Sequence, residues 1–161
     1  MAIIGENGVG KSTLLKIIMD KIKEHSSLKI GYMPQNYEDL LDPTLSPVRF
    51  LVTTGEKEAM TKAFTLLGSM KFTSDEMQQT IGHLSGGQKA KLLLVKMIMD
   101  GCEILILDEP TRNFSPLTKP VLCQAVAQYG GAIISVSHDR RYLKEVPSTI
   151  YELTSEGFTK K

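Results

Sequence analysis

The sequence predicts an α/β fold in which a mostly parallel sheet is flanked by helices. Apolar runs alternate with segments of helical periodicity, which is the pattern of parallel strands joined by helical crossovers. A stretch without a good strand, from about Asn36 to Gly82, interrupts this alternation and predicts an inserted helical subdomain at about residues 36–100. The strands are expected near residues 2–4, 28–33, 103–107, 132–136 and 148–153.

The first strand leads directly into a glycine-rich segment that fits G-x-x-x-x-G-K-[ST]. Glycines let such a loop wrap closely, so that its amides converge on a polyphosphate. Lys11 supplies a point charge for the β- and γ-phosphates, and the Ser12 hydroxyl can ligate Mg²⁺. A helix expected over residues 12–24 directs its positive N-terminus at the same place, which disfavours the alternative of a plain flexible turn. The predicted ATP-binding residues are Gly5, Glu6, Asn7, Gly8, Val9, Gly10, Lys11, Ser12 and Thr13.

Two carboxylates follow the apolar run that ends at Leu107. Such a run is typical of a strand buried on both faces of a parallel sheet, and ligands bind beyond the carboxyl ends of these strands. Asp108 is therefore suited to hold Mg²⁺, and Glu109 to polarise the attacking water. The alternative is a pair of surface carboxylates after a core strand, which the nearby phosphate loop disfavours.

Two further polar residues follow predicted strands and are expected at the same edge of the sheet. His138 comes directly after the strand at 132–136 and can contact the γ-phosphate or the attacking water. Gln35 follows the strand at 28–33, and its amide can reach Mg²⁺ or the water. Each residue alone is a weak signal, and a lone histidine after a strand is usually structural.

A second anion site is predicted where Ser85, Gly86, Gly87 and Gln88 precede a helix rich in leucine and methionine, at residues 89–100. One nucleotide does not need two such helix ends in one chain. We therefore expect this end to serve a nucleotide held mainly by another subunit or domain. The alternative is a tight turn with an N-cap.

Together, these segments resemble the nucleotide-binding domains of ATP-binding cassette (ABC) proteins, which are P-loop NTPases. The matching segments are Walker A (5–12), the Q-loop (Gln35), the signature (84–88), Walker B (104–109) and the H-loop (His138). The resemblance implies a single ABC ATPase domain over residues 1–161 that binds ATP with Mg²⁺. It implies that Asp108, Ser12 and Gln35 contact the metal, that Glu109 is the general base, and that His138 contacts the γ-phosphate. Two cassettes then close head to tail, each signature capping the other's ATP.

Within that family the sequence most resembles the ABC-F group, which has two cassettes on one chain and no membrane domain. Lys11 and Gln35 are only 24 positions apart, whereas transporter cassettes usually have a longer stretch in this interval. The amino-acid sequences of residues 29–35 and 136–143 are also similar to those of ABC-F proteins. This resemblance implies a cytoplasmic ATPase associated with the ribosome, as a translation factor or an antibiotic-resistance protein. Two alternatives remain: the ATP-binding subunit of a membrane transporter, which would pair with a permease, and an ATP-dependent clamp with little turnover.

The sequence departs from the family at two places. Arg112, Asn113, Phe114 and Ser115 stand where ABC-F cassettes usually have the D-loop residues Asn-His-Leu-Asp, which puts communication between paired sites in doubt. Ser115 and Pro116 instead predict the N-cap and first residue of the next helix. The upstream strands of the family fold, with the aromatic residue that stacks on adenine, are absent, so weak adenine recognition is expected.

Composition is that of an ordinary globular domain, with 42% hydrophobic and 23% charged residues and a net charge of +1. The total charge therefore gives no argument for a nucleic acid partner. No apolar run approaches the ~18 residues of a transmembrane helix, and no secretory signal is expected. Cys102 and Cys123 are predicted to be reduced, buried thiols, and residues 157–161 a frayed end.

Overall fold

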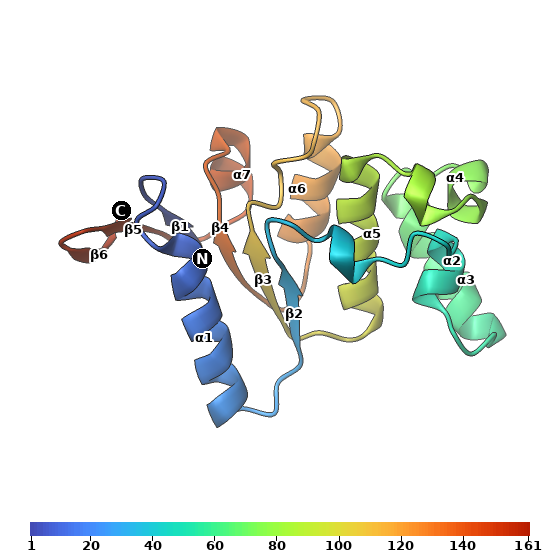
Figure 1. Cartoon of the computed structure of the whole chain (residues 1–161), viewed down its shortest axis with the longest axis horizontal. Coiled ribbons are helices and arrows are strands. Elements are labelled where there is room, and N and C mark those ends of the chain that lie inside the picture. The colour runs from blue at the N-terminus through green and yellow to red at the C-terminus, as the bar shows by residue number, and fades with distance from the viewer. The chain divides into compact units, whose positions relative to one another are not determined.

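The computed structural model describes residues 1–161, and the chain separates into two compact units (Figure 1). The first comprises residues 1–35, 102–112 and 123–161. The second comprises residues 36–101 together with residues 113–122. None of the helices combines the length and the apolar composition needed to cross a bilayer.

The first unit is built on one six-stranded sheet, so the predicted α/β class is confirmed. Its spatial order is β2-β3-β4-β1-β5-β6, and every neighbouring pair is parallel except β5 and β6. The strands are β1 (Ala2–Ile4), β2 (Ile30–Met33), β3 (Ile104–Asp108), β4 (Ala132–Val136), β5 (Ile150–Thr154) and β6 (Gly157–Lys160).

The prediction of a frayed C-terminal end was wrong, because residues 157–160 form strand β6, antiparallel to β5. Gly157 takes a φ of 145° at the start of the strand, which lets the chain reverse within a tight hairpin. The Tyr151 ring then stacks on Phe158 with centroids 4.8 Å apart. Cross-strand aromatic pairing of this kind stabilises β6, although its short and polar sequence does not predict a strand.

Helix α1 (Lys11–His25) packs on one face of the sheet and forms the main core of the first unit. Leu15 is fully buried against Ile3, Ile106 and Val136, which belong to β1, β3 and β4. Leu14, Ile18 and Ile22 extend the same apolar stripe at helical spacing. This packing fixes the start of α1 at the carboxyl end of β1.

The opposite face of the sheet carries the alternate strand residues, among them Leu105 and Leu107, both fully buried. Helix α7 (Arg140–Glu145) places Tyr142 there, without any exposure to solvent. Ser135 and Cys123 lie near the Tyr142 ring. Asp139 caps α7, its carboxylate accepting from the Arg141 and Tyr142 amides at 3.0 Å each.

The second unit contains helices and no strand. Two of its helices begin with clear caps: Ser46 caps the helix with Pro47 at its first position, and Thr73 with Glu76 forms a capping box. Its elements are η1 (Glu38–Leu40, a 3₁₀ turn), α2 (Pro47–Leu51), α3 (Lys57–Ser69), α4 (Ser74–Gln78), η2 (Ile81–His83, 3₁₀) and α5 (Gly86–Met99).

Two other sequence predictions need correction. Ser115 and Pro116 do not begin the next helix, because α6 (Lys119–Ala127) starts at Lys119. Residues 115–118 form a turn instead, in which the Ser115 carbonyl accepts from Thr118 and Lys119. Cys123 is buried as expected, but Cys102 is only partly buried; neither forms a disulfide.

Candidate functional site

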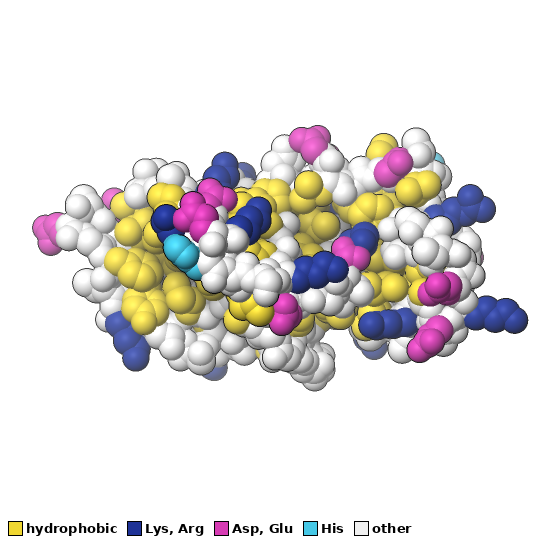
Figure 2. Space-filling model, turned by 90° about the horizontal axis from the view of Figure 1, so that it is seen from below, with side chains coloured by type: hydrophobic (Ala, Val, Ile, Leu, Met, Phe, Trp, Pro, Cys, Tyr) yellow, Lys and Arg dark blue, Asp and Glu magenta, His cyan; other side chains and the backbone are white.

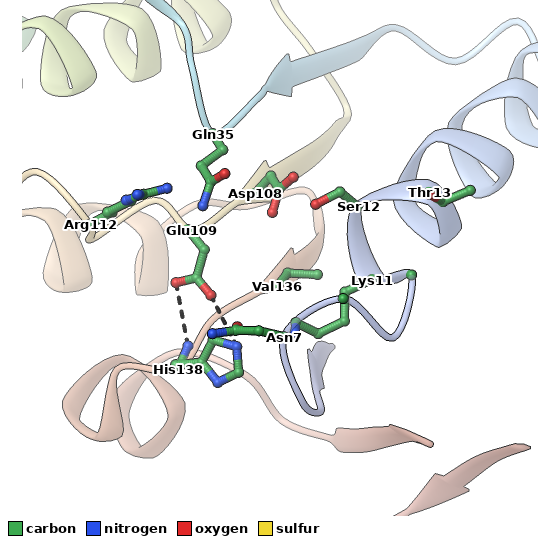
Figure 3. A pocket seen from close by; sticks show the side chains of 12 residues that line it. Asn7, Lys11, Ser12, Thr13, Gln35, Asp108, Glu109, Arg112, Val136 and His138 are labelled. Carbon is green, nitrogen blue, oxygen red and sulfur yellow. Dashed lines mark hydrogen bonds and ion pairs between the residues drawn. The ribbon is translucent and has the colours of Figure 1, made fainter. Parts of the chain in front are cut away.

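The carboxyl ends of β1, β2, β3 and β4 meet at one edge of the sheet, where the first unit has a cavity of about 630 Å³ (Figure 3). This volume is within the range of small-molecule sites. The loop between β1 and α1 forms one wall, and the residues that follow β2, β3 and β4 form the others. The lining residues are Asn7, Gly8, Gly10, Lys11, Ser12, Thr13, Gln35, Asp108, Glu109, Arg112, Val136 and His138.

The glycine-rich loop needs glycine for a steric reason at its first position. A Cβ on Gly5 would lie 2.3 Å from the Leu153 carbonyl oxygen, and Gly5 has a φ of 148°. At the other end of the loop, Gly10 is the N-cap of α1 with a φ of 100°. The loop can therefore lie close against β5 and turn directly into the helix, with the first amides of α1 open to the cavity.

Lys11 is the best-held side chain of this loop, only 8% exposed. Its ammonium donates to the carbonyls of Gly5 at 2.9 Å and Glu6 at 2.8 Å. The lysine thus spans the loop from within and keeps its positive charge at the centre of the curve. A compact cation held inside a ring of amides is a suitable group for phosphate oxygens.

Three of the nine predicted ATP-binding residues do not line this cavity. Gly5 and Glu6 line a neighbouring, shallower cavity of about 660 Å³, together with Asn7 and His138. Val9 lines neither; its amide donates to the Glu6 carbonyl at 3.4 Å and so helps to close the loop. These three residues shape the loop, and the other six face the cavity.

The residues expected to hold Mg²⁺ offer a carboxylate, a hydroxyl and an amide oxygen. Asp108 is the last residue of β3 and is only 4% exposed. Figure 3 shows its carboxylate directed toward the Ser12 hydroxyl, with the Gln35 amide on the same cavity wall. Oxygen donors of this kind suit a hard cation. No group of three or more His, Cys, Asp or Glu side chains converges in the chain.

Glu109 and His138 form the polar pair of the cavity (Figure 3). The His138 Nε2 lies 3.6 Å from one Glu109 carboxylate oxygen, and the His138 amide donates to the other at 3.4 Å. Burial raises the pKa of Glu109, while His138 opposes that rise. A carboxylate with a raised pKa is a stronger base than an ordinary glutamate, which suits proton abstraction from water.

The backbone at Glu109 is strained, with a φ of 53°. Its amide donates to the Val136 carbonyl at 3.0 Å, which ties the residue to β4. A non-glycine residue in this region is unusual and often marks a functional position. The left-handed turn ends β3 and aims the Glu109 side chain back along the cavity instead of away from the sheet.

Two lining residues were missed as site residues. Val136 is the last residue of β4, and nothing in the sequence separates it from the other core positions. Arg112 was noted only as a departure from the family D-loop. Its position four residues after Asp108, within the loop beyond a site strand, was the available signal.

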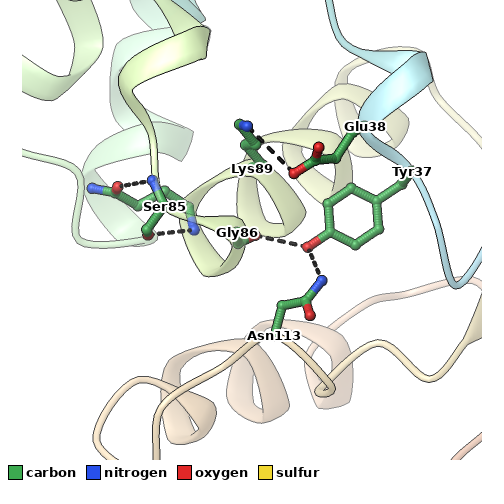
Figure 4. A network of polar contacts seen from close by, with 7 residues as sticks. Tyr37, Glu38, Ser85, Gly86, Lys89 and Asn113 are labelled. Carbon is green, nitrogen blue, oxygen red and sulfur yellow. Dashed lines mark hydrogen bonds and ion pairs between the residues drawn. The ribbon is translucent and has the colours of Figure 1, made fainter.

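The predicted signature segment belongs to the second unit, where Ser85 caps α5 (Figure 4). Its hydroxyl accepts from the Gln88 amide at 3.3 Å, and the Gln88 side chain accepts from the Ser85 amide at 2.8 Å. The capping alternative is therefore present in the structure. It does not exclude an anion at the same end, because the amides of Gly86 and Gly87 are not used by the capping box.

The chain has clear relatives among known proteins. The family model described as ABC transporter matches residues 1–112. "ABC transporter F family member 2" of Arabidopsis thaliana is 34% identical over 166 residues, covering 98% of this chain and 24% of that protein. "ATP-binding cassette sub-family F member 2" of Mus musculus is 33% identical, covering 99% of this chain and 27% of that protein. The chain thus spans about a quarter of the length of these relatives.

Solved structures agree on the fold. The dimeric structure of a post-hydrolysis state of the ATP-binding cassette MJ0796 bound to ADP and Pi superposes with a TM-score of 0.79. The sequence identity is 20%, and the alignment covers 99% of this chain and 84% of that one.

Proposed function

Because the chain belongs to the ABC transporter family, we propose that it binds MgATP in the cavity of its first unit and hydrolyses it together with a second cassette. It is an ATP-binding cassette of the P-loop ATPase type, and its curated relatives include F-subfamily proteins. The observation that carries this proposal is the convergence of Lys11, Asp108 and Glu109 on one cavity. Residues from two distant parts of the sequence, the loop at Lys11 and the end of β3 at Asp108 and Glu109, supply a phosphate cradle, a metal ligand and a base.

The phosphates bind along the loop between β1 and α1. Lys11 and the first amides of α1 hold the β- and γ-phosphates, and Asn7, Gly8 and Gly10 form the wall beside them. Asp108, Ser12 and Gln35 would hold Mg²⁺, which would supply positive charge to the phosphates. These three oxygen donors lie on the cavity wall next to the loop.

Glu109 takes the proton from the attacking water. Its raised pKa and its position at the end of β3 suit that role. His138 contacts the γ-phosphate or the water and keeps the carboxylate in place from 3.6 Å away. Gln35 reports the state of the nucleotide to the segment that follows it, which begins the second unit.

A second cassette completes the site. Ser85, Gly86, Gly87 and Gln88 start a 14-residue helix, and its amides and dipole suit an anion. The dimeric state of the MJ0796 cassette supports a partner of the same kind. We propose that this segment contacts the ATP held by the partner cassette, on the same full-length chain or in a homodimer.

The F-subfamily names of the relatives favour a cytoplasmic ABC-F protein over a transporter subunit. Ribosome association, in translation or antibiotic resistance, rests on that resemblance. On the face drawn in Figure 2, basic and acidic side chains are interspersed, so overall charge adds no support for an RNA partner. Co-sedimentation of the full-length protein with ribosomes in ATP is the test. ATP-independent or absent binding would contradict this part of the proposal.

The nucleotide site is tested with Lys11→Ala. Removing the ammonium at the centre of the loop should weaken MgATP binding by a hundredfold or more, on the order of 3 kcal/mol. Isothermal calorimetry measures the affinity. Lys16→Ala removes the same charge from an exposed position of α1 and is the matched control. Equal ATP affinity in the Lys11 and Lys16 variants would refute the phosphate-loop assignment.

A further inference from the structure

We propose that Arg112 contacts the terminal phosphate of the nucleotide bound in its own cassette. This inference rests on the proposed function and adds a phosphate-binding residue to that site. The family motif does not include this residue, because Arg112 lies in the D-loop segment whose sequence departs from that of the family.

A tight turn returns Arg112 to the cavity. The chain leaves β3 at Glu109 with a left-handed backbone, and the Arg112 amide then donates to the Glu109 carbonyl at 3.1 Å. Between them Pro110 is buried and Thr111 is only 2% exposed, which anchors the turn. The turn brings Arg112 back beside the residue proposed as the base instead of letting the chain run away from the sheet.

The Arg112 side chain extends from this turn toward the cavity, on the side of Gln35 (Figure 3). Arg112 is an exposed residue, and none of its guanidinium N–H groups donates to a protein acceptor in the structure. Its donors are therefore available to a ligand in the cavity. A planar guanidinium can grip two oxygens of one phosphate, which the Lys11 ammonium cannot do.

Apart from Mg²⁺, the lining offers a triphosphate little positive charge. Asp108 and Glu109 contribute two carboxylates, and Lys11 contributes one ammonium that two loop carbonyls already share. A triphosphate adds further negative charge, most of it at its terminal phosphate. Arg112 is the other cationic side chain of the lining.

The position of Arg112 selects the terminal phosphate over the rest of the nucleotide. Lys11 and Ser12 belong to the loop that holds the β- and γ-phosphates, and Glu109 addresses the water beyond the γ-phosphate. Arg112 is tied by its turn to Glu109 and shares the cavity wall with it. The guanidinium therefore lies at the γ end, where it discriminates ATP from ADP and steadies the charge that develops during transfer.

The test measures the affinities of the 161-residue chain for ATP and for ADP, both with Mg²⁺, by calorimetry. Arg112→Ala should weaken ATP binding roughly tenfold or more and leave ADP binding within about twofold. Arg112→Lys should lie between, because it keeps the charge and loses the two-pronged contact. Arg49→Ala, which removes an exposed charge from α2, should match the wild type. Retained ADP affinity shows that the Arg112 variants are folded.

Three results would overturn the proposal. Unchanged ATP affinity in Arg112→Ala would show that the guanidinium touches no phosphate, and an equal loss of ATP and ADP would place it elsewhere on the nucleotide. A loss seen only at chain concentrations that give dimers would assign the contact to the partner's nucleotide. A wild-type chain that binds neither nucleotide would instead count against the proposed function itself.

Discussion

Glu109 is the residue that we propose as the base of the site. Its side chain is only 15% exposed, and this burial raises the pKa of the carboxylate. The His138 amide donates to the carboxylate, and the His138 ring lies beside it. Burial disfavours the charged carboxylate and raises its pKa, and the interaction with His138 at 3.6 Å opposes that rise. The net result is a pKa above the ordinary glutamate value, which makes the carboxylate a stronger base.

The pH profile of hydrolysis should show this shift. Because the pKa of Glu109 is raised, the rate should begin to fall on acidification at a higher pH than the ordinary glutamate value of about 4.3. The measurement is kcat at saturating MgATP against pH. The same shift has the opposite sign for stability: protonation favours the folded state, so this contribution is present at low pH and is lost as pH rises through the folded pKa.

Removal of the histidine provides the control for that profile. His138→Ala takes away the interaction that lowers the pKa of Glu109, so the acid limb should move to still higher pH. Glu109→Gln should have little activity at any pH. An acid limb that stays at the ordinary glutamate value in both the wild type and His138→Ala would contradict the assignment of Glu109 as the base.

At the scale of the elements, the N-terminus of α5 is held by side chains from two other segments of its unit. The Tyr37 hydroxyl donates to the Gly86 carbonyl at 2.7 Å and accepts from the Asn113 side-chain amide at 2.9 Å (Figure 4). A Cβ on Gly86 would lie 3.3 Å from the Asn113 Cβ, and one on Gly87 would lie 3.3 Å from the Asn113 carbonyl oxygen. The altered D-loop segment thus packs directly on the signature glycines of its own unit.

Tyr37→Phe should loosen this support. The change removes two hydrogen bonds of a hydroxyl in a side chain only 5% exposed, so it should cost about 1–2 kcal/mol of unfolding free energy. Urea denaturation followed by circular dichroism measures the cost. Tyr151→Phe, in the β5–β6 hairpin, should leave the midpoint unchanged. Equal midpoints for the two variants would show that the Tyr37 network does not stabilise the second unit.

Two helix starts carry strong local signals in the sequence. Pro47 after Ser46, and Glu76 three residues after Thr73, are capping patterns that act within one helical turn. Strand β6 and the late start of α6 lack such signals. β6 depends on ring stacking across a hairpin, and residues 115–118 favour a side-chain hydrogen bond between Ser115 and Thr118 over an early helix start.

At the scale of the whole molecule, the site edge could be predicted because the rule behind it is topological. Parallel strands end at the same edge, so Gln35, Asp108 and His138 were placed together from strand positions alone. The strain at Glu109 and the return of Arg112 to the cavity could not be predicted, because both follow from the turn after β3. The grouping of residues 113–122 with the second unit likewise depends on tertiary contacts.

Hydrolysis by this chain should depend on association. If the signature segment serves the partner's nucleotide, the rate per chain should rise with protein concentration. Mixing Lys11→Ala with Ser85→Arg provides a sharper measurement, because the mixed dimer has one site with both an intact loop and an intact signature. The mixture should recover activity that neither variant has alone. A rate per chain independent of concentration, with no recovery on mixing, would contradict a shared site.

The left-handed backbone at Glu109 has a consequence for how far this protein can be stabilised. For a residue with a Cβ, the left-handed conformation lowers the free energy of unfolding by roughly 1 kcal/mol, whereas glycine adopts it without this strain. Glu109→Gly should therefore melt higher than Glu109→Ala, the reverse of their order at most positions, while neither hydrolyses ATP. Differential scanning calorimetry of the two variants would show it. At position 109, glycine would favour thermal stability, whereas the proposed role as the base requires glutamate.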